Sequence, residues 1–166
     1  MEVPLWLLAL AAVFLPSLPL MFHVRLMYYI AKGKVAGRFK HFADSVHLWG
    51  MVTPDEVDIN MHMNNSSYNK VADFSRYEHF IRLCGKHLSK YRIANGGVYF
   101  VFLKELKPLA TYNLSTEVVG FGEKWLFVQN VFRTSAGAVA AHGICRLVFK
   151  EGRRTVRPCD ALRSFG

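Results

Sequence analysis

The feature that most limits the possible folds is a single helical segment followed by a row of strand-like segments. The helical segment runs from Ser66 to Cys84; Asn64 or Asn65 suits its N-cap, and Gly85 suits its left-handed end. Apolar, β-branched and aromatic residues predict the strands, which are Ser45–Val52, Val98–Leu103, Tyr112–Phe121, Leu126–Thr134 and Ala138–Lys150. Short turns join the later strands, and short connections favour antiparallel pairs. The sequence therefore predicts an α+β domain, residues 45–152, in which one long helix lies across a curled antiparallel sheet.

Two details of this domain are further predictions. The run Val98–Leu103 is apolar and aromatic without interruption, which predicts a strand that is buried on both faces. In the last residues of the sequence, 153–166, apolar residues show no periodicity, and we expect a C-terminal tail there.

The N-terminal segment is the second strong signal. No charged residue occurs from Val3 to Phe22, and about twenty helical residues span roughly 30 Å, the thickness of a bilayer's hydrocarbon core. Lysines and arginines follow this segment while only Glu2 precedes it, an asymmetry typical of a cytosolic C-terminal side. We therefore expect a hydrophobic anchor helix in residues 1–24, a basic linker in residues 25–44, and a membrane location, the endoplasmic reticulum first, with the domain facing the cytosol.

Two alternatives to the anchor stay open, because Pro16 and Pro19 can kink or end a helix. One is a signal peptide, whose cleavage would make the protein secreted, although the segment lacks a basic start. The other is a buried core helix.

Composition excludes several other classes. The three cysteines, Cys84, Cys145 and Cys159, have the spacing of neither a zinc site nor a disulfide framework, and we interpret them as reduced thiols. Serine-hydrolase, phosphate-loop, dinucleotide and metal-ligand patterns do not occur. The net charge of +9 comes without a nucleic-acid recognition motif, so we expect no nucleic-acid partner and no metal.

The stretch from Asp58 to Asn65 holds the richest chemistry in the chain. It contains an acid, three amides and an imidazole within eight residues, directly before the predicted helix. A helix N-terminus presents unpaired N–H donors and the positive end of the helix dipole. These groups together can act on a carbonyl.

The sequence from Glu56 to Tyr68, Glu-Val-Asp-Ile-Asn-Met-His-Met-Asn-Asn-Ser-Ser-Tyr, resembles the signature of single hot-dog acyl thioesterases. This group includes the bacterial 4-hydroxybenzoyl-CoA thioesterase-like enzymes and, in doubled form, the plant acyl-ACP thioesterases. The continuation Ala72–Arg76 and Cys84–Gly85, with the apolar N-terminal segment, narrows the resemblance to the member-six group of the thioesterase superfamily. The resemblance implies the hot-dog fold, in which a sheet wraps around one long helix. In the turn Lys107–Thr111, Leu109 and Ala110 stand where relatives often carry Gly-Asp.

By position, Asp58, Asn60 and His62 match the acid, amide and imidazole assigned to catalysis in the plant enzymes, and Asp58 lies near the catalytic aspartate of the bacterial ones. We predict that Asp58 is a nucleophile or general base, that Asn60 positions water or the acyl oxygen, and that His62 orients the base or donates to the carbonyl. The structural alternatives are a turn residue for Asp58 and a packed loop residue for His62.

The remaining predicted site residues bind substrate. Backbone N–H groups near Ser66 and Ser67 are the predicted oxyanion donors, and Asn64, Asn65 and Tyr68 adjoin them. Arg146 and Lys150 alternate along one strand and are candidates for the phosphates of coenzyme A. The alternatives are cap and turn roles for the asparagines, a core role for Tyr68, and a solvated basic rim.

The expected function is therefore hydrolysis of acyl-CoA at a membrane, with no cofactor other than the coenzyme A of the substrate. One copy of the fold leaves an exposed sheet edge, so we expect a homodimer with joined sheets. The alternative function is a non-catalytic scaffold that binds acyl-CoA or lipid at the membrane.

Overall fold

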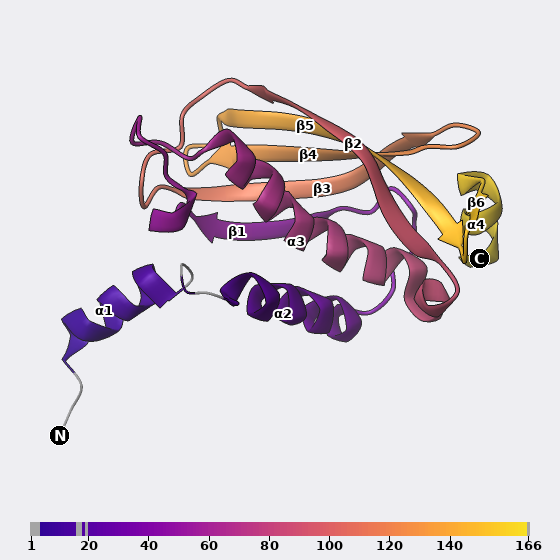
Figure 1. Cartoon of the computed structure of the whole chain (residues 1–166), viewed down its shortest axis with the longest axis horizontal. Helices are drawn as coiled ribbons and strands as arrows, with labels where there is room; N and C mark the ends of the chain where they lie inside the picture. The colour runs from indigo at the N-terminus through magenta and orange to yellow at the C-terminus, as the bar shows by residue number, and fades with distance from the viewer. Residues whose placement is uncertain (1–3, 16–17, 19, 166) are drawn as a thin grey trace.

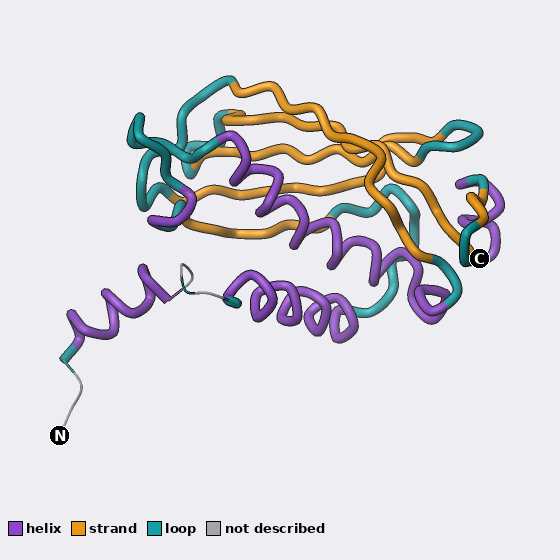
Figure 2. The backbone as a smooth tube through the Cα atoms, in the orientation of Figure 1, coloured by secondary structure: helices purple, strands orange, loops and turns teal. Residues whose placement is uncertain are grey.

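The structure, a computed structural model, describes residues 4–15, 18 and 20–165 of the 166-residue chain. Its elements are α1 (Leu5–Phe14), α2 (Met21–Ala36), β1 (Val46–Met51), the 3-10 helix η2 (Pro54–Glu56), α3 (Asn65–Cys84), the 3-10 helix η3 (Gly85–Ser89), β2 (Arg92–Phe102), β3 (Thr111–Phe121), β4 (Leu126–Thr134), β5 (Val139–Glu151), β6 (Arg154–Val156) and α4 (Pro158–Phe165). Figure 1 labels them, and Figure 2 separates helices, strands and loops along the same trace.

The strands form one antiparallel sheet in the order β1-β3-β4-β5-β2. The short strand β6 pairs with the end of β5, beyond the point where β4 stops. Helix α3 crosses one face of this sheet (Figure 1). The prediction of an α+β hot-dog fold with an antiparallel sheet and one long central helix is confirmed.

Helix α3 is held in place by its ends and by burial on several sides. Asn64 caps its start, and Gly85 ends it with a positive φ of 52°. Its first half packs Tyr68 and Phe74 into one core cluster with Tyr112, and its second half packs Phe80 into another with Phe149. A helix buried on more than one side fixes its own N-terminus accurately, and the candidate site lies there.

Strand β2 differs from the prediction. It starts at Arg92 rather than Val98, because the chain stays paired with β5 across an irregularity between Asn95 and Gly97. The expected burial on both faces is wrong for the single chain: Tyr99 is 70% exposed and Leu103 is 63% exposed. The reason is position, since β2 is the last strand of the sheet on its side.

The N-terminal segment contains two described helices instead of one continuous helix. The apolar helix α1 has 10 residues, and α2 begins only at Met21, after Leu20 in a left-handed conformation with φ of 70°. Pro16 and Pro19 lie outside the described residues. Among the described residues, no helix is both long and apolar enough to cross a membrane.

The segments expected as a linker and a tail carry structure that packs on the domain. Helix α2 lies within residues 21–36 and runs beside α3, with Leu26 and Tyr29 against the first core cluster. At the other end, α4 buries Ala161 and Phe165 in the second cluster. Residues far apart in the sequence therefore support both ends of α3.

Candidate active site

The residues between η2 and α3 form a closed loop. A bridge pairs Val57 with Met63 across its base. Inside it, the Asp58 N–H donates to the His62 carbonyl at 3.0 Å, and the Met61 N–H donates to the Asp58 carbonyl at 3.1 Å. Met61 has a φ of 60°, a conformation that is uncommon for a residue other than glycine. These backbone bonds hold residues 57–63 in one shape, and we name them the catalytic loop because they carry the predicted catalytic residues.

The catalytic loop brings Asp58 and His62 together. The Asp58 carboxylate accepts the Asn60 N–H on Oδ1 at 2.8 Å, while Oδ2 lies 3.6 Å from Nδ1 of His62. Both side chains are partly exposed, Asp58 at 19% and His62 at 25%. The pair is thus oriented and also within reach of water. Asn60 contributes its backbone N–H to the carboxylate, and the residue itself is exposed.

The start of α3 uses its donors differently from the prediction. Asn64 Oδ1 accepts the Ser66 N–H at 2.8 Å, and the Asn64 carbonyl accepts the Ser67 N–H at 2.9 Å. Both predicted oxyanion donors are therefore engaged in the helix cap. The Asn65 N–H donates to no acceptor within the described part of the chain, and it is the first residue of the helix.

A cleft of about 180 Å³ lies between this helix start and the end of β2. His62, Met63, Asn65 and Tyr68 line one side, and residues 102–105 line the other. The Tyr68 ring is buried against Phe102 and Phe132, and this burial raises the pKa of Tyr68 to about 12. Asp58 does not itself line the cleft; its Oδ2 lies 3.6 Å from Nδ1 of His62, which does. The arrangement places the His62 imidazole and the first residue of the helix, with its free N–H, around one small space that Phe102 and Leu103 help to line, and the Asp58 carboxylate lies next to that imidazole.

Comparison with known proteins fits this geometry. The family model described as the thioesterase-like superfamily matches residues 52–164. The chain belongs to this superfamily. A Saccharomyces cerevisiae protein described as a probable thioesterase is 30% identical over 90% of this chain and 74% of its own length. A thioesterase of Penicillium oxalicum is 31% identical over 67% of this chain and 50% of its own length, so this chain spans about half of that relative.

The predicted resemblance to the member-six group is also confirmed: the THEM6 protein of Xenopus laevis is 25% identical over 75% of this chain and 62% of its own length. Solved structures show the same fold. A Thermus thermophilus thioesterase complexed with coenzyme A and Zn matches with a TM-score of 0.64 and 22% identity, over 72% of this chain and 94% of that one. A Staphylococcus aureus protein in complex with CoA matches with a TM-score of 0.64 and 14% identity, over 76% and 84%. The family and its thioesterase relatives indicate thioester hydrolysis as the general chemistry.

Within one chain of this thioesterase-like protein, Arg146 and Lys150 lie away from the cleft. Arg146 pairs with Gly97, donates from Nε to the Gly96 carbonyl at 2.9 Å, and stacks over Trp125 at 4.9 Å. Phe102 at the cleft pairs instead with Ala141. Five positions along a strand correspond to roughly 17 Å. The structure therefore does not bring these two predicted phosphate ligands to the Asp58 group in a single copy.

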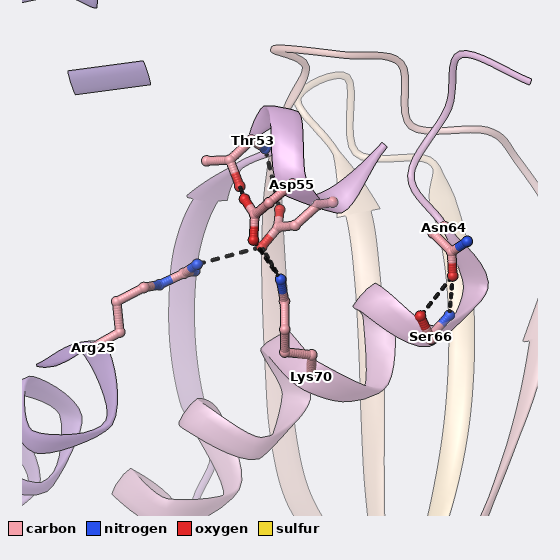
Figure 3. A network of polar contacts seen from close by, with 7 residues as sticks. Arg25, Thr53, Asp55, Asn64, Ser66 and Lys70 are labelled. Carbon is pink, nitrogen blue, oxygen red and sulfur yellow. Dashed lines mark hydrogen bonds and ion pairs between the residues drawn. The ribbon is translucent and has the colours of Figure 1, made fainter. Parts of the chain in front are cut away.

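Glu56 is a buried carboxylate beside the site, and sequence reasoning did not identify it. Glu56 has 0% exposure; it accepts the Thr53 N–H at 3.2 Å and an Arg25 N–H at 3.4 Å, and Lys70 lies 4.0 Å away. Lys70 also pairs with Asp55 at 2.7 Å (Figure 3). The Glu56 carbonyl accepts the Asn64 N–H at 2.7 Å, which ties this network to the cap of α3.

Part of that network has a signal in the sequence. Thr53 and Glu56 have the spacing of a capping box, in which the two side chains satisfy each other's backbone N–H groups. Arg25 has no such signal, because it comes from α2, 31 positions away. Within the described ranges, no group of three or more His, Cys, Asp or Glu side chains could hold a metal.

Proposed function

We propose that this protein hydrolyses fatty acyl-CoA at a membrane, with Asp58 as nucleophile or general base. The observation that carries the proposal is the placement of the Asp58–His62 pair, 3.6 Å apart, beside the first turn of α3. The apolar wall of the cleft, with Phe102 and Leu103, suits the acyl part of a thioester. The catalytic loop is closed by its own backbone bonds, so the pair is oriented before substrate arrives.

Thioester hydrolysis requires three contributions from the chain. The Asp58 carboxylate either attacks the thioester carbon or removes a proton from a water that attacks it. The Asn65 N–H, at the positive end of the α3 dipole, stabilises the oxyanion; such a donor is worth about 3–4 kcal/mol. In the base route, an acyl–oxygen bond to the water forms, the acyl–sulfur bond breaks, and the proton that Asp58 removed passes to the thiolate of coenzyme A. In the nucleophile route, Asp58 first replaces the thiolate, and a water then cleaves the acyl–Asp58 anhydride, supplying the proton of the thiol and restoring the carboxylate. His62 holds the carboxylate in place from Nδ1.

A second copy of the chain supplies what one copy lacks. Strand β2 is an unpaired edge with exposed Tyr99, and an antiparallel pairing of two β2 strands about their midpoint brings Arg92 of one copy beside Phe102 of the other. Lys150 pairs with Arg92 and moves with it. This homodimer would place basic side chains near the cleft, where coenzyme A phosphates need them. Analytical ultracentrifugation should show a dimer that Tyr99→Lys converts to a monomer.

The membrane part of the proposal rests on the N-terminal residues. Helix α1 is apolar around its whole circumference, with Leu5, Trp6, Leu8 and Leu10 all exposed. The next helix, α2, carries cations and an exposed Tyr28, as expected of a segment at the headgroup level of a cytosolic face. Carbonate extraction of membranes from expressing cells tests this attachment, because a full-length chain recovered in the supernatant contradicts it.

The hydrolysis is tested with the purified full chain and acyl-CoAs of several lengths, by release of free thiol. Asp58→Asn should lower kcat about 10³-fold, equivalent to about 4 kcal/mol of transition-state stabilisation, without a change in melting temperature. The matched control is Asp160→Asn, the same change on α4, which should leave the rate unchanged. A folded wild-type dimer that binds acyl-CoA and never releases thiol would instead identify the alternative function, a non-catalytic acyl-CoA or lipid scaffold.

A further inference from the structure

The apolar side chains at the tip of the catalytic loop face outward. Ile59 is 98% exposed and Met61 is 65% exposed. In the neighbouring turn between β2 and β3, Leu109 is 51% exposed. The turn is joined to the loop region by bonds from the Met63 N–H to the Leu106 carbonyl and from the Leu109 N–H to the Val52 carbonyl. Ile59, Met61 and Leu109 form what we name the tip surface.

Two of these three residues are held in a conformation that is costly for them. Met61 has a φ of 60° and Leu109 a φ of 63°, in the left-handed region that favours glycine. Glycine or asparagine would fit these turns at lower cost, and both are more soluble choices for a turn. A strained backbone that displays a large apolar side chain to the outside indicates a use for that side chain.

The tip surface lies opposite helix α1. A groove of about 800 Å³ lies between the two, and every residue that lines this groove is apolar. Trp6, Leu10 and Phe14 line it from α1, while Met61 and Leu109 line it from the domain. Figure 1 shows α1 near the end of the sheet that carries η2, and far from the hairpin between β3 and β4. The proposed membrane helix and the catalytic loop thus share one apolar end of the molecule.

Charged side chains lie around this end. Lys104 and Lys107 are exposed on either side of Glu105 in the segment that leads to Leu109, so the segment has net positive charge. Leu109 thus follows two lysines, while Ile59 and Met61 lie between Asp58 and His62. An exposed apolar residue close to lysines is typical of surfaces that lie in the headgroup region of a bilayer.

We propose that the tip surface docks on a phospholipid bilayer, so that long acyl chains reach Asp58 from the lipid. This inference rests on the proposed function and names its substrate class: long-chain acyl-CoA already partitioned into the membrane. Ile59 and Met61 enter the acyl region beside α1, the thioester lies at headgroup level against the catalytic loop, and the coenzyme A part stays in water. Short acyl-CoAs, which remain dissolved, reach the same cleft without the bilayer.

The first experiment measures the depth of the loop. The full chain with Cys159→Ser and Ile59→Cys is labelled with bimane and mixed with vesicles of phosphatidylcholine and phosphatidylserine that contain brominated lipid. The remaining cysteines, Cys84 and Cys145, are buried. The label at position 59 should lose most of its fluorescence to the bromines. The matched control is Glu123→Cys, on a side chain 91% exposed. It lies in the hairpin between β3 and β4, which Figure 1 shows at the other end of the sheet from α1, and its label should stay unquenched.

The second experiment separates docking from chemistry. The double variant Ile59→Ser and Leu109→Gly keeps all proposed catalytic groups: the Ile59 side chain is 98% exposed and packs on none of them, and glycine fits the positive φ at position 109. Its rate on butyryl-CoA without vesicles should stay within twofold of wild type. Its rate on palmitoyl-CoA carried by vesicles should fall on the order of tenfold, the effect of leaving about one buried apolar side chain out of the lipid. The control Val119→Ser, an exposed apolar residue on β3, should change neither rate.

Four outcomes overturn the inference. An unquenched label at position 59 places the tip surface in water. An equal loss of both rates in the double variant means damage to the cleft, and an unchanged palmitoyl-CoA rate means that docking does not matter. A label that is shielded before vesicles are added, with a double variant that turns from dimer to monomer, identifies a protein interface. If wild type hydrolyses neither substrate, the proposed function fails, while the quenching experiment still decides whether the tip docks.

Discussion

Two histidines at opposite ends of α3 show how one helix serves two purposes. His62, just before the first turn, is 25% exposed and lies 3.6 Å from the Asp58 carboxylate. His79, near the last turn, has 0% exposure; its Nε2 lies 3.0 Å from the Asp44 carbonyl, and its ring packs against Phe39. Burial lowers the pKa of His79 to about 4 and raises that of the nearby Cys84 to about 12, so both stay uncharged. Polar groups at the first end can meet a substrate, while those at the second end are part of the packing.

The largest effect on stability is expected at Glu56, whose buried carboxylate lies near the N-terminal end of α3. Glu56→Ala removes the carboxylate that Arg25 and the Thr53 N–H use, and should lower the free energy of unfolding by about 4 kcal/mol. Glu151→Ala, which removes an exposed ion pair with Lys90, is the control and should change it by less than about 0.5 kcal/mol. Urea denaturation of the two variants measures both. Equal, small changes would mean that Glu56 is not needed to hold α2 and the loop together.

Near the C-terminal end of α3, the buried His79 should make the free energy of unfolding depend on pH. Unfolded His79 takes up a proton near pH 6.5, while the folded state resists it down to about pH 4. Stability from this residue is therefore complete above pH 6.5 and is lost as the pH falls toward 4, by up to about 3 kcal/mol. His79→Gln should flatten this part of a plot of unfolding free energy against pH. His62→Gln should leave the same part of the plot in place; if it flattens instead, the two ends have been assigned the wrong way round.

A smaller effect on stability is expected at Asn64, the N-cap of α3. Asn64→Ala leaves the Ser66 N–H without its side-chain acceptor and should cost about 1 kcal/mol in unfolding free energy. Asn64→Ser keeps an acceptor and should recover most of it. The rate of thiol release with Asn64→Ala should fall by more than this stability change explains, because the cap orients the Asn65 N–H. Unchanged kcat in a destabilised Asn64→Ala protein would separate the cap from the chemistry.

The smallest effect has the opposite sign. Leu109→Gly removes the strain of a left-handed backbone and should raise the free energy of unfolding by about 0.5 kcal/mol. This value is the strain energy that is removed, less the conformational entropy that glycine adds to the unfolded chain. Leu103→Gly, at an exposed residue without a positive φ, should lower it. Thermal melts of both variants give the comparison. A loss of stability with glycine at position 109 would remove the evidence for strain in that turn.

The parts of this fold that local patterns encode were predictable. The strand β3 was predicted to within one residue of its observed bounds, Tyr112–Phe121 against Thr111–Phe121, because β-branched residues run between two turn signals. The cap at Asn64 follows from the chemistry of its side chain. The fold of the thioesterase-like domain was reached in the same way, with help from the resemblance of residues 56–68.

The parts that depend on contacts between distant residues were not predictable. Helix α4 buries Ala161 and Phe165, but it has only 8 residues and too few turns to show a period. The ion pair of Arg25 with Glu56 joins two segments whose closeness no sequence spacing reveals. The exposure of β2 was mistaken for burial, because an apolar run does not show whether its strand lies in the middle or at the edge of the sheet. Within the site, the roles of Ser66 and Ser67 were assigned without knowing that Asn64 occupies both donors.

The ion pair between Arg25 and Glu56 has a practical consequence for anyone who shortens this protein. A fragment trimmed to residue 45, where the first strand is about to begin, would leave out α2 and with it the guanidinium that faces the buried Glu56. Such a fragment would dissolve more readily and yet leave the buried Glu56 with only Lys70, 4.0 Å away, as a countercharge. Trimming that stops before Met21 keeps the Arg25 guanidinium, and an assay that finds only the shorter form inactive would report the loss of this contact and not the properties of the intact protein.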